Sequence, residues 1–77
     1  MSEVILYTKV GCGQCIGAKM FMQQNNIPVS VRDIGDPVIR EEFDQYGFGS
    51  LPVIVLPNGE AFSGFQVDKL KALKESL

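Results

Sequence analysis

Residues 4–15 are VILYTKVGCGQC, and this stretch decides the fold. The run from Glu3 to Thr8 is almost wholly apolar, which is typical of a strand that is covered on both faces of a sheet. The residues from about Gly13 to Asn25 predict a helix with one apolar face. Cys12 and Cys15 therefore lie where a buried strand gives way to a helix.

The position of the two cysteines predicts their chemistry. The first turn of a helix has free backbone N–H groups and the positive end of the helix dipole, and both favour an anion. A thiolate is such an anion, so we expect the pKa of Cys12 to be lowered and its sulfur to be a nucleophile at neutral pH. Cys15 follows one helical turn later, close enough to form a disulfide with Cys12. A CxxC motif at such a junction indicates a redox-active dithiol.

Two other uses of the cysteine pair are a structural disulfide and a metal site. A disulfide between residues three positions apart closes a very short loop, so it removes little entropy from the unfolded chain. A structural zinc ion usually has four Cys or His ligands, whereas the chain has two cysteines and no histidine. Only a dimer that shares ligands, or an iron–sulfur cluster completed by external thiols, would supply the missing ones.

Composition limits the kinds of partner. The 77 residues predict one domain, and the 45% apolar content argues against disorder. The net charge is −2, and Lys and Arg are scattered, so we expect no nucleic acid to bind.

No apolar stretch approaches the roughly 20 residues of a membrane span, and the N-terminus lacks a signal-peptide pattern. We therefore expect a cytoplasmic location, where a lone cysteine pair is more often catalytic than structural.

The rest of the chain predicts a single α/β domain over residues 1–77. Asp36 and Pro37 are typical of the start of a helix, and Gly47 is typical of its end. Pro57-Asn58-Gly59 predicts a turn between two antiparallel strands. The expected elements are a strand at 3–8, a helix at 13–25, a strand at 29–33, a helix at 37–46, strands at 52–56 and 60–63, and a helix at 66–76. Three helices would then cover both faces of a four-stranded mixed sheet in the order β-α-β-α-β-β-α.

Apolar spacing assigns the inward face of each predicted helix. Ile16 and Met20 lie off the inward face of the first helix, so we expect them to be candidates for exposed contact residues. In the strand at 29–33, Val29 and Val31 alternate with polar residues. The residues expected to face the core are Ala18, Phe21 and Met22 in the first helix, Ile39, Phe43 and Tyr46 in the second, and Leu70, Leu73 and Leu77 in the third.

Four segments together resemble those of a known family. They are Tyr7-Thr8-Lys9, Cys12-Gly13-Gln14-Cys15, Leu51-Pro52-Val53 and Phe62-Ser63-Gly64-Phe65. On these segments the chain resembles a glutaredoxin-like protein of thioredoxin fold, and most of all the NrdH-redoxin group. The resemblance implies that Cys12 is the attacking cysteine, that Cys15 is the resolving cysteine and that Pro52 is a cis-proline facing them. It also implies a monomer that needs no bound cofactor, because the sulfurs themselves carry the electrons.

The resemblance leaves two electron sources open. NrdH-redoxins are reduced by thioredoxin reductase and pass electrons to a ribonucleotide reductase, whereas glutaredoxins proper use glutathione. The resemblance to NrdH-redoxins includes Gln14, because glutamine is common before the second cysteine in that group. Glutathione-binding relatives have an acidic residue soon after Ser63-Gly64 that holds the ammonium group of glutathione, whereas this chain has no carboxylate there until Asp68. Two features of the sequence differ from the NrdH-redoxin pattern. Lys9 matches a basic position that binds a glutathione carboxylate, and Phe62 stands where NrdH-redoxins usually have tryptophan.

Several residues around the motif are candidates for contact with a partner. Lys9 is either a solvated loop lysine or a contact for an anion, and Gly11 and Gly13 serve either close approach of a partner or plain loop geometry. A cis bond before Pro52 would expose the backbone of Leu51 to a substrate strand. The full set of expected partner-binding residues is Lys9, Gly13, Gln14, Leu51, Pro52, Ser63, Gly64 and Phe65.

Overall fold

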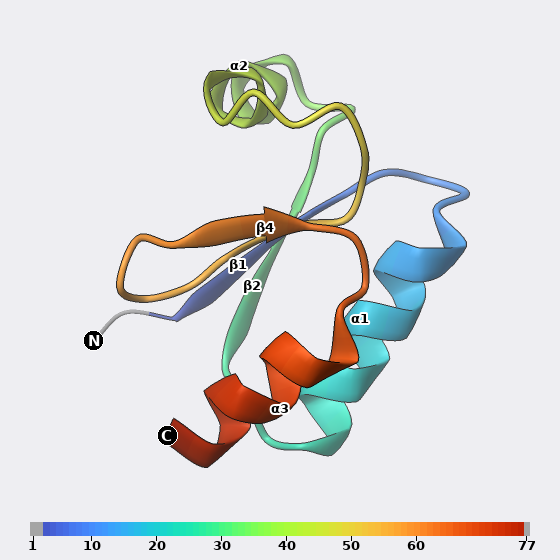
Figure 1. Ribbon diagram of the computed structural model, residues 1–77. Coiled ribbons are helices and arrows are strands. Elements are labelled where there is room, and N and C mark those ends of the chain that lie inside the picture. The colour runs from blue at the N-terminus through green and yellow to red at the C-terminus, as the bar shows by residue number, and fades with distance from the viewer. Residues whose placement is uncertain (1–2, 77) are drawn as a thin grey trace.

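The computed structural model describes residues 3–76, and its elements follow the expected order β-α-β-α-β-β-α (Figure 1). No helix in this described part is long and apolar enough to cross a membrane. The elements are β1 (Val4–Thr8), α1 (Gly13–Gln24), β2 (Val29–Asp33), α2 (Pro37–Gln45), β3 (Val53–Val55), β4 (Ala61–Ser63) and α3 (Val67–Ser76).

The four strands form one mixed sheet in the order β2-β1-β3-β4. β1 pairs parallel with β2 and antiparallel with β3, and β4 pairs antiparallel with β3. The register places Leu6 beside Ile54, and Ile54 beside Phe62, so these three side chains share one face of the sheet. Because β1 is a central strand and its last residue, Thr8, comes only four positions before Cys12, the sheet fixes the position of the loop that carries the motif.

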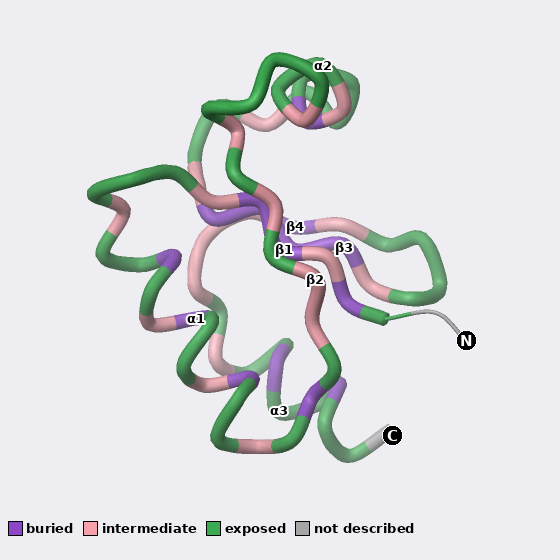
Figure 2. The backbone as a smooth tube through the Cα atoms, turned by 180° about the vertical axis from the view of Figure 1, so that it is seen from behind, coloured by how far each residue is buried: buried purple, intermediate pink, exposed green. Residues whose placement is uncertain are grey.

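The helices cover the two faces of the sheet unequally. α1 and α3 lie together on one face, and α2 lies on the other (Figure 1). Alternate residues of β1 supply both layers: Leu6 packs into the core under α1 and α3, and Tyr7 packs into the core under α2. In Figure 2 the buried positions lie along β1, β3 and β4 and on the inner sides of the helices, whereas the edge strand β2 has none. The apolar run of β1 is therefore explained by a strand that has a helix layer on each side.

The observed helix ends agree with the chemistry of their caps. Asp36 is the N-cap of α2, where its Oδ1 accepts a hydrogen bond from Val38 N at 2.9 Å, and Pro37 occupies the first turn. Gly47 follows α2 with φ 73°, a left-handed conformation that favours glycine. The strands and helices are shorter than expected by one or two residues at several ends. Pro52, for example, precedes β3 rather than starting it, since it has no N–H to donate to the sheet.

Three expected core residues are less buried than their spacing predicts: Phe21 and Ile39 are half-buried and Tyr46 is exposed, and Val31 of the alternating strand is exposed as well. Val31 is exposed because β2 is an edge strand, so one of its faces is incompletely covered. Tyr46 is exposed at the end of α2, where its ring lies 5.8 Å from the ring of Tyr7. Phe21 is half-buried and packs against the edge of the core. The expected inward position of Leu77 lies outside the described residues.

A polar cluster connects α2 to the sheet. The Tyr7 hydroxyl donates a hydrogen bond to Glu42 Oε1 at 3.2 Å, and Arg32 forms an ion pair with the same oxygen at 2.6 Å. The Tyr7 ring also lies 5.9 Å from the ring of Phe43. Burial, the neighbouring Tyr46 and the hydrogen bond to Glu42 raise the pKa of Tyr7 to about 12. The protonated hydroxyl is therefore the form that holds α2 in place.

This shifted pKa predicts an alkaline loss of stability. The folded-state pKa of Tyr7 lies above the 10.0 of an unperturbed tyrosine. The protonated Tyr7 hydroxyl therefore contributes its full stabilisation of the fold below pH 10, and this contribution is lost as the pH rises towards 12. We expect the free energy of unfolding, measured in urea from about pH 9 to about pH 11.5, to fall about 1–2 kcal/mol more in the wild type than in Tyr7→Phe. Equal pH slopes for the wild type and Tyr7→Phe would contradict the role of Tyr7.

Candidate functional site

The two cysteines form a disulfide at the N-terminus of α1. Their Cα atoms are 5.2 Å apart, within the usual range for a disulfide, so one helical turn brings the sulfurs together without distorting the helix. Of the cysteines in the described chain, neither is free. No group of three or more His, Cys, Asp or Glu side chains among the described residues could hold a metal ion.

The two sulfurs have different surroundings. Cys12 is the N-cap of α1, is half-buried, and its Sγ accepts a hydrogen bond from the backbone N–H of Cys15 at 3.1 Å. Cys15 lies inside the first turn and is only 1% exposed. A partner can therefore reach Cys12 but not Cys15. The same N–H group is placed to stabilise negative charge on Cys12 when the disulfide is reduced.

The peptide bond between Leu51 and Pro52 is cis, as the resemblance implied. Pro52 is buried, and its carbonyl accepts a hydrogen bond from Gly64 N at 2.8 Å. Gly64 has φ 86°, which favours glycine at this position. Two of the expected site residues that are twelve positions apart in the sequence are thus joined directly.

A hollow of about 470 Å³ opens beside Cys12. Leu51 and Lys9, both expected at the site, line it together with Cys12. Arg40 of α2 lines it as well, and this residue was not expected from the sequence. Its guanidinium pairs with Asp44 at 3.1 Å and lies 5.9 Å from the centre of the Phe43 ring. The remaining lining residues are Ile34, Phe43, Gly49 and Ser50.

The other expected contact residues lie outside this hollow. Gly13 and Gln14 are exposed at the start of α1. Ser63 lies at the end of β4, where its hydroxyl oxygen is 3.4 Å from that of Ser50. The ring of Phe65 packs against Phe21, with 6.2 Å between centroids. The expected set is therefore divided, because Lys9 and Leu51 line the hollow with Cys12 whereas these four residues lie outside it.

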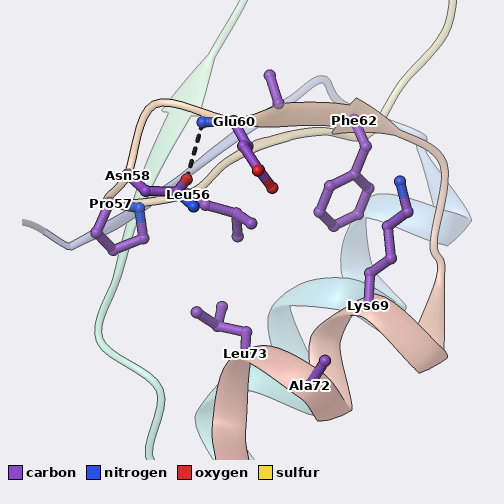
Figure 3. Close-up of a pocket in the computed structure, with 9 residues that line it drawn as sticks. Leu56, Pro57, Asn58, Glu60, Phe62, Lys69, Ala72 and Leu73 are labelled. Atoms are coloured by element: carbon purple, nitrogen blue, oxygen red, sulfur yellow. Dashed lines mark hydrogen bonds between the residues drawn. The ribbon is translucent and has the colours of Figure 1, made fainter. Parts of the chain in front are cut away.

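A second hollow, of about 520 Å³, lies between the β3–β4 turn and α3 (Figure 3). Leu56 and Leu73 point into it, and Lys69 Nζ lies 5.0 Å from the centre of the Phe62 ring. No cysteine lines it. The hollow beside Cys12, although smaller, is therefore the one connected with sulfur chemistry.

The model of the family described as glutaredoxin matches residues 4–62, which is most of the chain. The chain belongs to the glutaredoxin family. No curated protein matches it well enough to count as a relative. With its CxxC disulfide, this glutaredoxin-family chain is a thiol–disulfide oxidoreductase.

Several solved structures resemble the chain over nearly its whole length and establish the thioredoxin fold. A variant of the thioredoxin-like protein BC3987 is 30% identical, with a TM-score of 0.86 and 97% of each chain covered. NrdH-redoxin from Escherichia coli is 26% identical, with a TM-score of 0.83, 94% of this chain covered and 95% of the other. Glutaredoxin 1 from Francisella tularensis is 29% identical, with a TM-score of 0.70, 96% of this chain covered and 93% of the other.

The unequal exposure of the sulfurs predicts unequal reactivity after reduction. We expect iodoacetamide at about pH 7 to label Cys12 first, because its sulfur is accessible and accepts an N–H from the helix. Cys15 should react only after unfolding. Peptide mapping by mass spectrometry after limited labelling would identify the modified cysteine, and preferential labelling of Cys15 would contradict this assignment.

Proposed function

We propose that the protein reduces disulfides in other proteins, with Cys12 as the attacking sulfur and Cys15 as the resolving sulfur. The observation that carries this proposal is the difference between the two cysteines. Cys12 is accessible and accepts a hydrogen bond from the first turn of α1, whereas Cys15 is buried directly behind it.

The reaction proceeds in two exchanges. The Cys12 thiolate attacks one sulfur of the partner's disulfide, forms a mixed disulfide and releases the other sulfur as a thiolate. The thiolate of Cys15 then attacks Cys12, which releases the second partner thiolate and forms the Cys12–Cys15 disulfide. Two electrons have passed to the partner, and protons from solvent complete its thiols. A reductase that supplies two electrons restores the dithiol.

Removal of the resolving sulfur should stop the reaction half-way. Cys15→Ser is expected to accumulate a covalent complex with a protein disulfide, because Cys12 still attacks but nothing releases the partner. Cys12→Ser should form no such complex, since Cys15 is buried. Non-reducing gel electrophoresis after incubation with insulin would distinguish the two variants. Equal amounts of complex from both would show that the order of attack is wrong.

We further propose that thioredoxin reductase supplies the electrons and that a ribonucleotide reductase is one acceptor. Similarity to NrdH-redoxin, a glutaredoxin-like protein described as having a thioredoxin-like activity profile, supports this choice. The loop after Gly64 supports it too. There Phe65 packs on Phe21, and Gln66 Nε2 donates to the Ser63 carbonyl at 2.9 Å, so neither residue offers a carboxylate to an ammonium group. These partners fit a monomer in a reducing compartment such as the cytoplasm.

A glutathione-dependent activity is the second candidate, and one observation favours it. Lys9 and Arg40 both line the hollow beside Cys12, so two cations are available to a carboxylate of glutathione. The ammonium group of glutathione would have Asp68 as the nearest carboxylate after Gly64 in the sequence, and this residue is exposed in the first turn of α3. An unpaired ammonium forfeits a charge-assisted hydrogen bond of about 1.5–3 kcal/mol.

The two electron sources can be compared directly on the oxidised protein. We expect NADPH with thioredoxin reductase to restore the dithiol at least about tenfold faster than glutathione with glutathione reductase, since the loss of one charge-assisted bond is worth roughly that factor. NADPH absorbance follows both reactions. Rapid turnover with glutathione and none with thioredoxin reductase would instead assign the chain to the glutathione-dependent glutaredoxins.

A further inference from the structure

An apolar ridge extends away from the disulfide along the outer side of α1. We define it as Val10, Ile16 and Met20, which are 90%, 57% and 50% exposed. Ile16 and Met20 follow Cys12 at intervals of four residues, so they lie on the same side of the helix as the attacking sulfur. Val10 lies in the loop just before Cys12. Figure 2 shows that the outer side of α1 is exposed, whereas its inner side carries the buried residues.

The folded chain itself makes no use of this ridge. The core is filled from the opposite side of α1 by Ala18 and Met22, both fully buried. A Cβ atom placed on Gly13, beside the sulfur, would meet no atom within 4 Å, so the surface next to Cys12 is open. The only charged side chain of α1 is that of Lys19. When a partner covers large apolar residues that were exposed to water, the free energy of binding becomes more favourable.

Reaction at Cys12 requires a partner to cover this region. The mixed disulfide places the partner's sulfur in direct contact with that of Cys12, and a standard interface buries about 800 Å² on each side, a disc of about 16 Å radius. Ile16 is about 6 Å from Cys12 along the helix axis and Met20 is about 12 Å from it. The ridge therefore lies within the area that a protein partner occludes.

We propose that the ridge binds apolar side chains that flank the reactive disulfide of the protein substrate. It thereby favours substrates with apolar residues beside their cysteines. This inference rests on the proposed function and names the class of substrate that the same site prefers. The hollow beside Cys12 differs from the ridge because two cations, Lys9 and Arg40, line it together with apolar side chains.

Two synthetic substrates test this preference. Both are symmetric, disulfide-linked peptides of equal length and zero net charge, and they differ only in whether leucine or serine occupies the positions beside the cysteine. Each turnover by the reduced protein releases two peptide thiols and leaves the Cys12–Cys15 disulfide. We expect the wild type to reduce the leucine peptide about tenfold faster than the serine peptide, which corresponds to partial burial of one or two leucines.

The variants locate the preference on the protein. Ile16→Gln combined with Met20→Gln removes the two helical side chains of the ridge without changing the net charge, and it should reduce the preference to about twofold or less while the serine peptide reacts at the wild-type rate. Val38→Gln is the matched control, because Val38 is a helical residue of α2, 68% exposed and outside the ridge. It should keep the full preference.

Each other result has a definite meaning. Equal rates of the wild type on both peptides, or an undiminished preference in the ridge variant, would overturn the inference while leaving the proposed function intact. Slower reduction of both peptides by the ridge variant would also overturn it. Ile16 and Met20 would then affect the reactivity of Cys12 and Cys15 rather than the recognition of flanking side chains. A wild type that dimerises through the ridge, with no peptide preference, would assign the ridge to a second copy. Failure of the wild type to reduce either peptide would refute the proposed function itself.

Discussion

The hydrogen bond from Cys15 N to Cys12 Sγ is the interaction on which the rest of the site depends. It exists because α1 begins at Gly13, directly after the first cysteine, so Cys12 takes the N-cap position and its sulfur meets the free N–H groups of the first turn. The same helix start directs Cys15 into the core. One boundary between loop and helix therefore makes two chemically identical residues unequal, and a dithiol that reacts in a fixed order needs this inequality.

The sheet holds that boundary in place. β1 is a central strand whose side chains enter two separate cores, one under α1 and α3 and the other under α2. In so short a chain, each layer depends on few contacts, and α2 is attached partly through the cluster of Tyr7, Arg32 and Glu42. That attachment matters for the site, because Arg40 and Phe43 of α2 form one wall of the hollow beside Cys12.

Cys12 lies between two surfaces of different character. On the α2 side the hollow carries Lys9 and Arg40, and on the α1 side the ridge offers only apolar side chains. A sulfur in this position can distinguish partners by what flanks their cysteines, even though the sulfur exchange is the same for all of them. Membership of the glutaredoxin family explains the exchange, and these two surfaces are where selectivity among partners would arise.

The sequence by itself determined the order of the elements, the helix start at the cysteines and the caps of α2, because each of these depends on neighbouring residues and on local backbone chemistry. The resemblance added the cis bond before Pro52, which spacing alone does not reveal. Only the tertiary structure decided that Arg40 lies beside Cys12, that Gly64 bonds to Pro52 and that Val31 is exposed on an edge strand. These features depend on which strands become neighbours and how α2 packs across them. Contacts between residues far apart in the chain leave no periodic pattern in the sequence.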